Sequence, residues 1–280
     1  MIVGESFVVS YARRGWFVRV VYLILAIANY VFSFGGRIGR GDVVVLCYHG
    51  VSKDQGGSFA RHMAGIARKA VSLAGVGDGR ACCFAPKPHV CITFDDAFEN
   101  LLENALPILD SLGIPATVFA VPGNLGRTPQ WRISPSHPEH GERIMTAEHL
   151  RGISAGNITI GSHTLTHPAL TELSAEQIRW ELAESKRNLE EMLGRPVVDL
   201  ALPHGACSDV VLDIARETGY RRAYTLEPRA WTQSDGIAVP RFSMSPDAWG
   251  IEFYLTCAGA YAWLGPWRRF VRAIRRRMGR

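Results

Sequence analysis

The sequence predicts one α/β domain built around a parallel β-sheet. Two observations favour this fold class. Short apolar runs with strand character alternate with helix-like stretches through residues 41–250. No long linker or low-complexity segment divides those residues, and a chain of 280 residues is long enough for one large domain. The number of apolar runs indicates six or seven strands, arranged as a barrel or as an open sheet.

The elements follow one another in a regular order. Strands are expected at 42–50, 89–96, 116–121, 158–164, 197–205, 221–226 and 236–242. Helices are expected at 58–75, 98–113, 146–153, 174–193 and 208–219. Pro107 should kink the second of these helices because it lacks a backbone N–H. Ser174 and Gln177 form a capping box at the start of the fourth helix, and Gly194 is placed to end it.

An apolar helix is expected within residues 1–40. Between residues 20 and 34 only Asn29 and Ser33 are clearly polar. A helix that spans a bilayer needs about 20 apolar residues, so this run is short for a full span. It could serve as a membrane anchor, or it could pack on the domain. Arginines on both sides of the run give no clear orientation in a membrane.

The C-terminal residues 251–280 predict a basic amphipathic helical segment. Trp267, Phe270, Val271 and Ile274 fall on one helical face, with arginines on the others. This pattern is typical of a helix that lies in a membrane interface. The alternative is a helix that covers the domain and turns its arginines to water.

The charge of the chain is concentrated at its ends. Residues 1–40 contain five Arg and one Glu, residues 266–280 contain seven Arg and no acid, and the remaining residues carry a net charge of −6. An acidic body does not suit a protein that binds nucleic acid. The two basic ends favour contact with an anionic surface, so we expect a membrane-associated protein.

The spacing of the six cysteines matches no paired zinc motif. Cys47 and Cys91 lie inside predicted strands, where a free cysteine acts as a small apolar residue. We interpret most of the six as core thiols. Because free thiols favour a reducing compartment, this interpretation favours the cytoplasmic face of the membrane.

Polar residues follow the predicted strands at the points where catalytic groups gather in parallel α/β folds. They are Tyr48-His49, Asp95-Asp96, the run from Ser162 to His167, and Pro203-His204-Gly205. Two adjacent carboxylates repel each other and need a partner. Each motif alone has an ordinary structural explanation, such as a helix N-cap for the aspartates or a core histidine for His49. Their recurrence at successive strand ends predicts an active site.

The residue types also predict a divalent metal. His163 and His167 are four residues apart, and on one helical turn this spacing would place both imidazoles on the same side. Two neutral histidines and one carboxylate form a common metal-binding set that leaves positions for water and substrate. One aspartate could supply that carboxylate, and the other would then be free to act as a base.

The motifs "TFDD" and "SHTLTH" resemble those of the polysaccharide deacetylases, the NodB-homology group of carbohydrate esterases. The resemblance covers most of residues 42–245. It implies a distorted (β/α) barrel of about seven strands and the hydrolysis of N- or O-acyl groups of sugars. It further implies one divalent metal. Zinc is the expected metal, and cobalt, nickel, iron or manganese would fit the same ligands.

The resemblance assigns a role to each matching residue. It makes Asp95 the catalytic base and makes Asp96, His163 and His167 the metal ligands. Pro203, His204 and Gly205 correspond to the third motif, in which a backbone N–H helps to bind the oxyanion. "CYHGV" resembles the branch of the family that takes its acid histidine from the first strand, which implies that His49 is the general acid.

The sequence departs from the family pattern at three places. The third motif usually begins with an Arg that contacts the base, and Ala201 stands there in this chain. Ala97 replaces the Gly that usually follows the two aspartates. The late Leu-x-His motif is absent near the C-terminus. We expect Arg241, in "VPRF", to supply the missing positive charge near Asp95.

The expected activity is deacetylation of an N-acetylated glycan. The expected arrangement is an anchor in residues 1–40, a catalytic domain in 41–250 and a basic segment in 251–280. Two alternatives remain at this stage. The substrate could be a lipid-linked sugar, or the protein could be an inactive homologue that only binds sugar.

Overall fold

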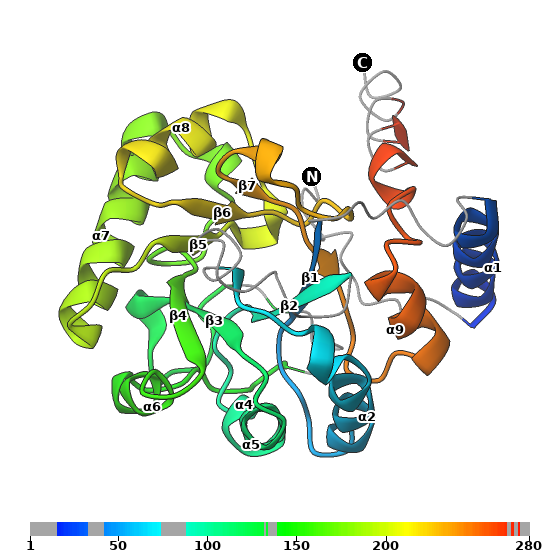
Figure 1. Cartoon of the computed structure of the whole chain (residues 1–280). Helices are drawn as coiled ribbons and strands as arrows, with labels where there is room; N and C mark the ends of the chain where they lie inside the picture. Colours follow the sequence, from blue (N-terminus) through cyan, green and yellow to red (C-terminus); the bar gives the residue numbers. More distant parts are fainter. Residues whose placement is uncertain are drawn as a thin grey trace.

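The computed structural model describes residues 16–32, 42–73, 88–131, 133, 139–267, 270–271 and 274. Their centre is a parallel sheet of eight strands with the order β7-β6-β5-β4-β3-β2-β1-β8 (Figure 1). The strands are β1 (Val43–Tyr48), β2 (His89–Phe94), β3 (Ala116–Ala120), β4 (Ile158–Ser162), β5 (Asp199–Ala201), β6 (Arg222–Tyr224), β7 (Ala238–Val239) and β8 (Phe242–Ser243). The α/β class and the parallel sheet agree with the prediction.

The two ends of the sheet are joined by a very short stretch of chain. β7 and β8 stand at opposite ends of the strand order, yet only Pro240 and Arg241 separate them in sequence. Three Cα–Cα steps cover at most about 11 Å, so the sheet must curl until its ends nearly meet. The result is a distorted barrel whose ends are connected by the chain. The prediction of one strand over 236–242 was wrong, because Pro240 cannot donate to a β-ladder and divides the segment.

β1 and β2 form the middle of the core. All six residues of each strand are buried, which is usual for a parallel strand that is covered on both faces. The two strands pair in register from Val43 opposite His89 to Tyr48 opposite Phe94. Because their carboxyl ends are level, His49 and Asp95 emerge at the same edge of the sheet.

Most helices form a layer outside the sheet (Figure 1). They are α2 (Gly56–Ile66), α4 (Leu101–Asn104), α5 (Leu106–Ser111), α6 (Ala147–Ile153), α7 (Ala175–Leu193) and α8 (Asp209–Glu217). Short 3-10 turns lie at Ala67–Lys69, Pro122–Asn124, Leu170–Glu172, Pro203–Gly205 and Gln233–Asp235. The capping box of Ser174 and Gln177 and the left-handed Gly194 at the end of α7 are confirmed.

Two predicted helices differ from the structure. The helix expected over 58–75 ends at Ile66, because Ala70 adopts an extended backbone and forms a bridge with Val90. The helix expected over 98–113 is divided at Ala105 into α4 and α5. Pro107 lies in the first turn of α5, where the missing N–H has no helical partner to lose. The expected kink is thus a complete break.

Two further helices lie beside the barrel. α1 (Trp16–Phe32) packs against α9 (Gly250–Cys257), an element that the sequence did not predict separately from the basic C-terminal segment (Figure 1). In the described part of the chain, no helix combines the length and the apolar character that a membrane crossing requires. Residues 270, 271 and 274 are helical, as expected for the C-terminal segment.

The described cysteines are free thiols. Cys47, Cys91 and Cys257 are buried, as expected for core thiols, whereas Cys207 is exposed. Cys82 and Cys83 lie outside the described residues.

Candidate active site

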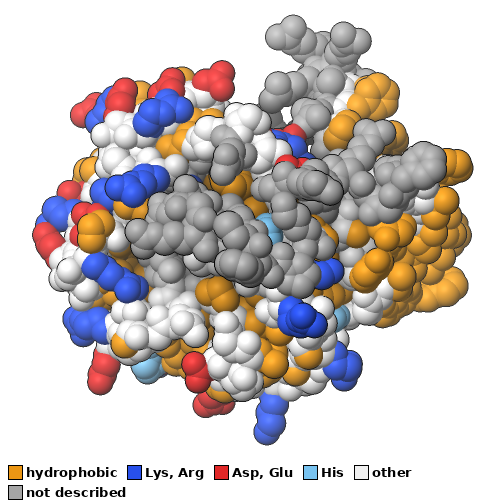
Figure 2. Space-filling model, viewed as in Figure 1, with side chains coloured by type: hydrophobic (Ala, Val, Ile, Leu, Met, Phe, Trp, Pro, Cys, Tyr) orange, Lys and Arg blue, Asp and Glu red, His pale blue; other side chains and the backbone are white. Residues whose placement is uncertain are grey.

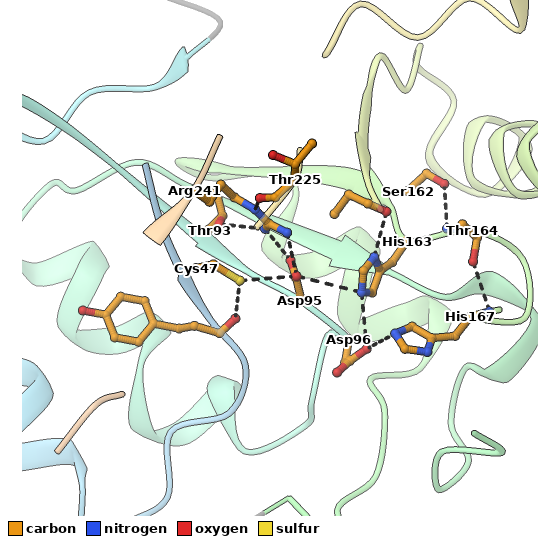
Figure 3. A network of polar contacts seen from close by, with 12 residues as sticks. Cys47, Thr93, Asp95, Asp96, Ser162, His163, Thr164, His167, Thr225 and Arg241 are labelled. Atoms are coloured by element: carbon orange, nitrogen blue, oxygen red, sulfur yellow. Dashed lines mark hydrogen bonds and ion pairs between the residues drawn. The ribbon is translucent and has the colours of Figure 1, made fainter. Parts of the chain in front are cut away.

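Asp95 is the first residue after β2 and is 2% exposed. Its backbone N–H donates to the carbonyl of Tyr48 at 2.9 Å, which continues the β1–β2 pairing by one residue. This bond fixes the point at which the side chain leaves the sheet. The carboxylate lies among side chains from β1, β2 and the β7–β8 connection (Figure 3).

Arg241 forms a two-pronged ion pair with Asp95. One terminal guanidinium nitrogen of Arg241 donates to Oδ1 of Asp95 at 2.6 Å, and the other donates to Oδ2 at 2.8 Å (Figure 3). Further bonds run to the Thr93 hydroxyl at 3.1 Å and to the Thr225 carbonyl at 3.2 Å. Arg241 is fully buried. Arg241 therefore lies next to Asp95, as expected from the sequence.

The ion pair determines the protonation of Asp95. Burial alone would raise the pKa of its carboxyl group, but the positive charge of Arg241 outweighs burial, so the pKa lies well below its usual range. Asp95 is therefore a carboxylate over the whole physiological range of pH. The Cys47 thiol also lies against it, with Sγ 3.3 Å from Oδ2.

Asp96, His163 and His167 converge beside Asp95. Oδ1 of Asp96 lies 3.6 Å from Nε2 of His163 and 3.5 Å from Nε2 of His167 (Figure 3). One ligand atom from each of the three residues lies within 4.8 Å of the others, and all three side chains are buried. This is the ligand set expected from the sequence.

The free atoms of this cluster fit a bound cation. His163 holds its Nδ1 against the carbonyl of Ala201 at 2.9 Å, and a carbonyl can only accept, so Nε2 is left without a proton and with its lone pair available. Oδ1 of Asp96 is buried and makes no hydrogen bond in the described structure. A divalent metal would satisfy both atoms, because a neutral imidazole and a carboxylate are its usual ligands.

The protonation of the cluster also suits a metal. Burial, followed by the charge of Asp95, raises the pKa of Asp96 well above its usual range. Burial lowers the pKa of His163 to about 4 and lowers that of His167 well below its usual value. The histidines are therefore neutral, and Asp96 needs a nearby cation to remain ionised.

The two histidines come together in a loop and not on a helical turn, so the predicted local structure was wrong. β4 ends at Ser162, and Thr164 and His167 both adopt left-handed backbone conformations, each with φ of 66°. Such conformations interrupt a helix. The loop doubles back and brings the two imidazole rings within 4.8 Å of each other.

Glu181, on α7, holds this loop. One of its carboxylate oxygens accepts from the backbone N–H groups of Leu165 and Thr166 at 2.9 and 3.0 Å. The other accepts from the Thr166 hydroxyl at 2.5 Å. Glu181 is 4% exposed. Glu181 was not predicted from the sequence, although an acid on the buried face of an amphipathic helix, between Ile178 and Leu182, is a readable signal.

Two other residues of the site were missed. Trp131 stacks on the ring of His167, with centroids 4.3 Å apart and the planes inclined at 24°. Glu139 is buried, accepts a hydrogen bond from the backbone N–H of Gly50 at 3.2 Å, and contributes to the raised pKa of Asp96. Both lie between the strand expected at 116–121 and the helix expected at 146–153, where the sequence has no clear strand or helix pattern. Their positions relative to the site could therefore not be predicted.

His49 and His204 lie around the same centre. His49 follows β1 directly, and it lies close enough to Asp95, His163, His167 and His204 to interact with each of them electrostatically. The ring of His204 packs edge-on against that of His167, with centroids 4.9 Å apart. The structure thus gathers these predicted residues at one end of the sheet.

The third motif forms a tight turn at this end of the sheet. Pro203 is buried at the start of a 3-10 turn, and His204 has φ of 59°. Gly205 also has a positive φ, and a Cβ there would lie 2.7 Å from the Cβ of Leu226. A glycine is therefore required at this position, and the turn exposes the imidazole of His204.

The departures from the family pattern have structural counterparts. Ala201 contributes its backbone carbonyl to His163, while the cation that contacts the base comes from Arg241 instead. Ala97 has φ of 54°, a conformation that glycine adopts at little cost. The alanine at this position therefore carries backbone strain.

Comparison with known proteins agrees with this geometry. The family model for polysaccharide deacetylase matches residues 85–223, which include Asp95, Asp96, His163 and His167. Residues 85–223 of this chain belong to the polysaccharide deacetylase family. The fold class and the family resemblance expected from the sequence are thereby confirmed.

Two curated relatives illustrate the similarity. YxkH of Bacillus subtilis (strain 168) is 31% identical over 173 residues, which are 61% of this chain and 55% of YxkH. The poly-beta-1,6-N-acetyl-D-glucosamine N-deacetylase of Staphylococcus aureus (strain MRSA252) is 28% identical, over 58% of this chain and 57% of the relative. The chain thus spans about half the length of the curated relatives that it matches.

Solved structures share the fold. IcaB from Ammonifex degensii matches with a TM-score of 0.62 and 24% identity, over 79% of this chain and 97% of IcaB. The Streptococcus pyogenes deacetylase PplD matches with a TM-score of 0.63 and 20% identity, over 78% of this chain and 98% of PplD.

Proposed function

We propose that this protein is a metal-dependent deacetylase that hydrolyses the N-acetyl group of a polymeric amino sugar. The observation that carries the proposal is that an ionised carboxylate and a potential metal site lie side by side. A carboxylate held ionised by Arg241 lies beside a buried Asp-His-His cluster whose free atoms suit a divalent cation. The family membership and the S. aureus relative's named activity support N-acetylglucosamine polymers as the substrate class.

Asp96, His163 and His167 would hold the metal. A divalent metal in such a site supplies positive charge that acidifies a water molecule and polarises a carbonyl. Zinc suits two imidazoles and one carboxylate, and other first-row divalent metals can bind the same ligands. The ring of Trp131 and the Glu181 clamp hold His167 and its loop in place, so the ligands are prearranged for binding.

Asp95 is the proposed general base. Its carboxylate accepts the proton of the attacking water, and the water oxygen bonds to the acetamide carbon. The paired charge of Arg241 keeps Asp95 unprotonated beforehand and holds both of its oxygens in place. His49 then donates a proton to the nitrogen as the C–N bond breaks, and the products are acetate and a free amine. The turn at Pro203–Gly205 would offer the backbone N–H of His204 to the developing oxyanion, because Pro203 has no N–H and that of Gly205 donates to the Leu202 carbonyl.

The test is acetate release by the purified full-length protein with zinc, cobalt, nickel, iron or manganese. The substrates are N-acetylglucosamine oligomers and, in a parallel arm, a polyprenyl-phosphate-linked N-acetyl sugar. We expect turnover of the oligomers and a loss of about 10²- to 10⁴-fold in Asp95→Asn. Asp110→Asn makes the same change on the exposed side of α5 and should be as active as the wild type. A metal-loaded wild type that releases no acetate would contradict the proposal and favour a protein that only binds sugar.

A further inference from the structure

α1 has its polar and apolar sides reversed relative to an ordinary surface helix. Its polar residues face the protein. Arg19 forms a two-pronged pair with Glu252, at 2.8 and 2.5 Å, and the amide of Asn29 donates to the carbonyl of Ala260 at 2.9 Å. Ala26, between them on the same face, is fully buried. The helix therefore packs on the domain through a face that combines these polar residues with the partly buried Tyr22, Leu23 and Tyr30.

The opposite face of α1 is apolar and open. Phe17, Ile24 and Val31, seven residues apart, are 73%, 59% and 62% exposed. A surface helix in water normally shows the reverse arrangement. Polar residues that face a protein interior while apolar residues face outward are usual where the surroundings are lipid. The two expectations for this segment, an anchor or a packed helix, are therefore compatible.

Exposed apolar side chains are concentrated in this part of the molecule. Of the sixteen large exposed hydrophobic side chains among the described residues, fourteen belong to α1, to α9 with its cap Trp249, and to residues 267–274. Figure 2 shows hydrophobic side chains gathered over the edge of the molecule where α1 lies. Tyr22 of α1 packs edge-on against Trp263 at 5.6 Å, so the C-terminal segment starts beside α1. A contiguous apolar surface of this kind marks an interaction site.

We propose that this apolar surface docks the protein onto an anionic lipid bilayer without crossing it. The proposal goes beyond the deacetylase activity and does not depend on it. A helix of 17 residues is about 25 Å long, which is less than the hydrocarbon thickness of about 30 Å. Because the Arg19–Glu252 pair fixes α1 against the domain, the helix would lie along the bilayer surface.

Charge complementarity favours lipid over a second copy of the chain. Seven Arg occur within residues 266–280, interleaved with Trp267, Phe270 and Ile274. Near the surface of an anionic membrane each Arg adds electrostatic attraction. A symmetric dimer through the same surface would instead bring the two Arg-rich segments together, because a two-fold interface joins identical patches. The exposed tryptophans Trp16 and Trp267 also suit the interface of a bilayer.

A groove beside this surface adds to the positive charge. It has a volume of about 900 Å³ and lies between α2 and α9, with Tyr30 of α1 in its lining. Arg61 and Lys69 line it, and Asp247 is the one acid among its described lining residues. A phosphate headgroup would find cations there next to an apolar wall.

The test is vesicle flotation of the full-length protein. Vesicles of neutral phosphatidylcholine are compared with vesicles that also contain phosphatidylglycerol. The test variant combines Phe17→Ser, Ile24→Gln and Val31→Gln. These side chains are exposed, so their loss should leave the domain folded, and thermal unfolding checks this. The matched control is Trp180→Gln with Val210→Gln, which removes the two exposed apolar side chains that lie on α7 and α8.

We expect the wild type and the control to float with anionic vesicles and the test variant to float at least about tenfold less. High salt should weaken the flotation of the wild type without abolishing it, since salt screens the charges but not the apolar contact. Equal flotation of the wild type and the test variant would overturn the proposal. A wild type that does not float but is a dimer in solution, and becomes a monomer in the test variant, would assign the surface to a second copy.

Discussion

Asp95 and Asp96 are neighbours in sequence and occupy opposite environments. Both oxygens of Asp95 accept hydrogen bonds from Arg241, so the protein itself satisfies this carboxylate. Oδ1 of Asp96 has no such partner among the described residues and faces the ring nitrogens of His163 and His167. Burial acts on both, yet the pKa of Asp95 is lowered and that of Asp96 is raised. The half of the site around Asp95 is therefore complete in the chain alone, whereas the half around Asp96 is built for a cation.

The largest stability effect should follow from removing the ion pair between Arg241 and Asp95. Arg241→Met leaves the buried carboxylate of Asp95 without its cation, and loss of one partner of a buried pair costs about 3–5 kcal/mol of unfolding free energy. Urea unfolding monitored by tryptophan fluorescence would measure the loss. The double variant Arg241→Met/Asp95→Asn removes both charges and should recover much of the loss. A single variant as stable as the wild type would show that the pair contributes little to the fold.

An intermediate effect should follow from weakening the contacts that hold the loop of His163 and His167. Glu181→Gln replaces the carboxylate that accepts hydrogen bonds from the backbone N–H groups of Leu165 and Thr166 and from the Thr166 hydroxyl. The loop that carries His163 and His167 would lose its fixed shape, and metal affinity should fall about 10- to 100-fold, as is usual when supporting groups are lost. Zinc titration against a competing chelator measures it. The control is Glu191→Gln, an exposed change on the same helix. Unchanged affinity in Glu181→Gln would mean that the loop holds its shape without the clamp.

The smallest effect concerns the backbone next to Asp96. Ala97→Gly removes left-handed strain of about 1–2 kcal/mol, and the added flexibility of glycine in the unfolded chain offsets about 0.5–1 kcal/mol of the gain. A net gain of about 0 to 1.5 kcal/mol in unfolding free energy is expected. Ala67→Gly, at a residue with φ of −49°, has no strain to release and should destabilise the protein. If both substitutions destabilised the protein equally, Ala97 would not be strained.

Much of the site could be predicted because it lies at strand ends. The apolar runs before His49 and Asp95 are unmistakable, and parallel strands bring their carboxyl ends to one edge. Arg241 could be singled out because "VPRF" follows an apolar run near the end of the predicted domain and the base needs a cation. Sequence alone could not show that Pro240 divides this segment into two strands at opposite ends of the sheet, because that depends on how far the sheet curls.

The loops were predicted less well than the strands. The four-residue spacing of His163 and His167 indicates a helix. However, Thr164 and His167 have left-handed backbone conformations, and the loop that contains them is held by hydrogen bonds to Glu181 on α7. Helical spacing describes local geometry and cannot anticipate a clamp from another element. The orientation of α1 could not be predicted from the sequence for a related reason. Its polar residues appeared as interruptions of an apolar run, and only the contacts with Glu252 and Ala260 show that they form the inward face.

The central claim, that the two aspartates have different tasks, is tested most directly by metal content. The wild type, Asp95→Asn and Asp96→Asn are dialysed against limiting zinc, and bound zinc per chain is measured by plasma mass spectrometry. The matched pair changes one carboxylate to an amide at adjacent positions. We predict about one zinc per chain in the wild type and in Asp95→Asn, and much less in Asp96→Asn, since a carboxylate is a far better ligand than an amide. Full zinc in Asp96→Asn, or an equal loss in both variants, would contradict the claim.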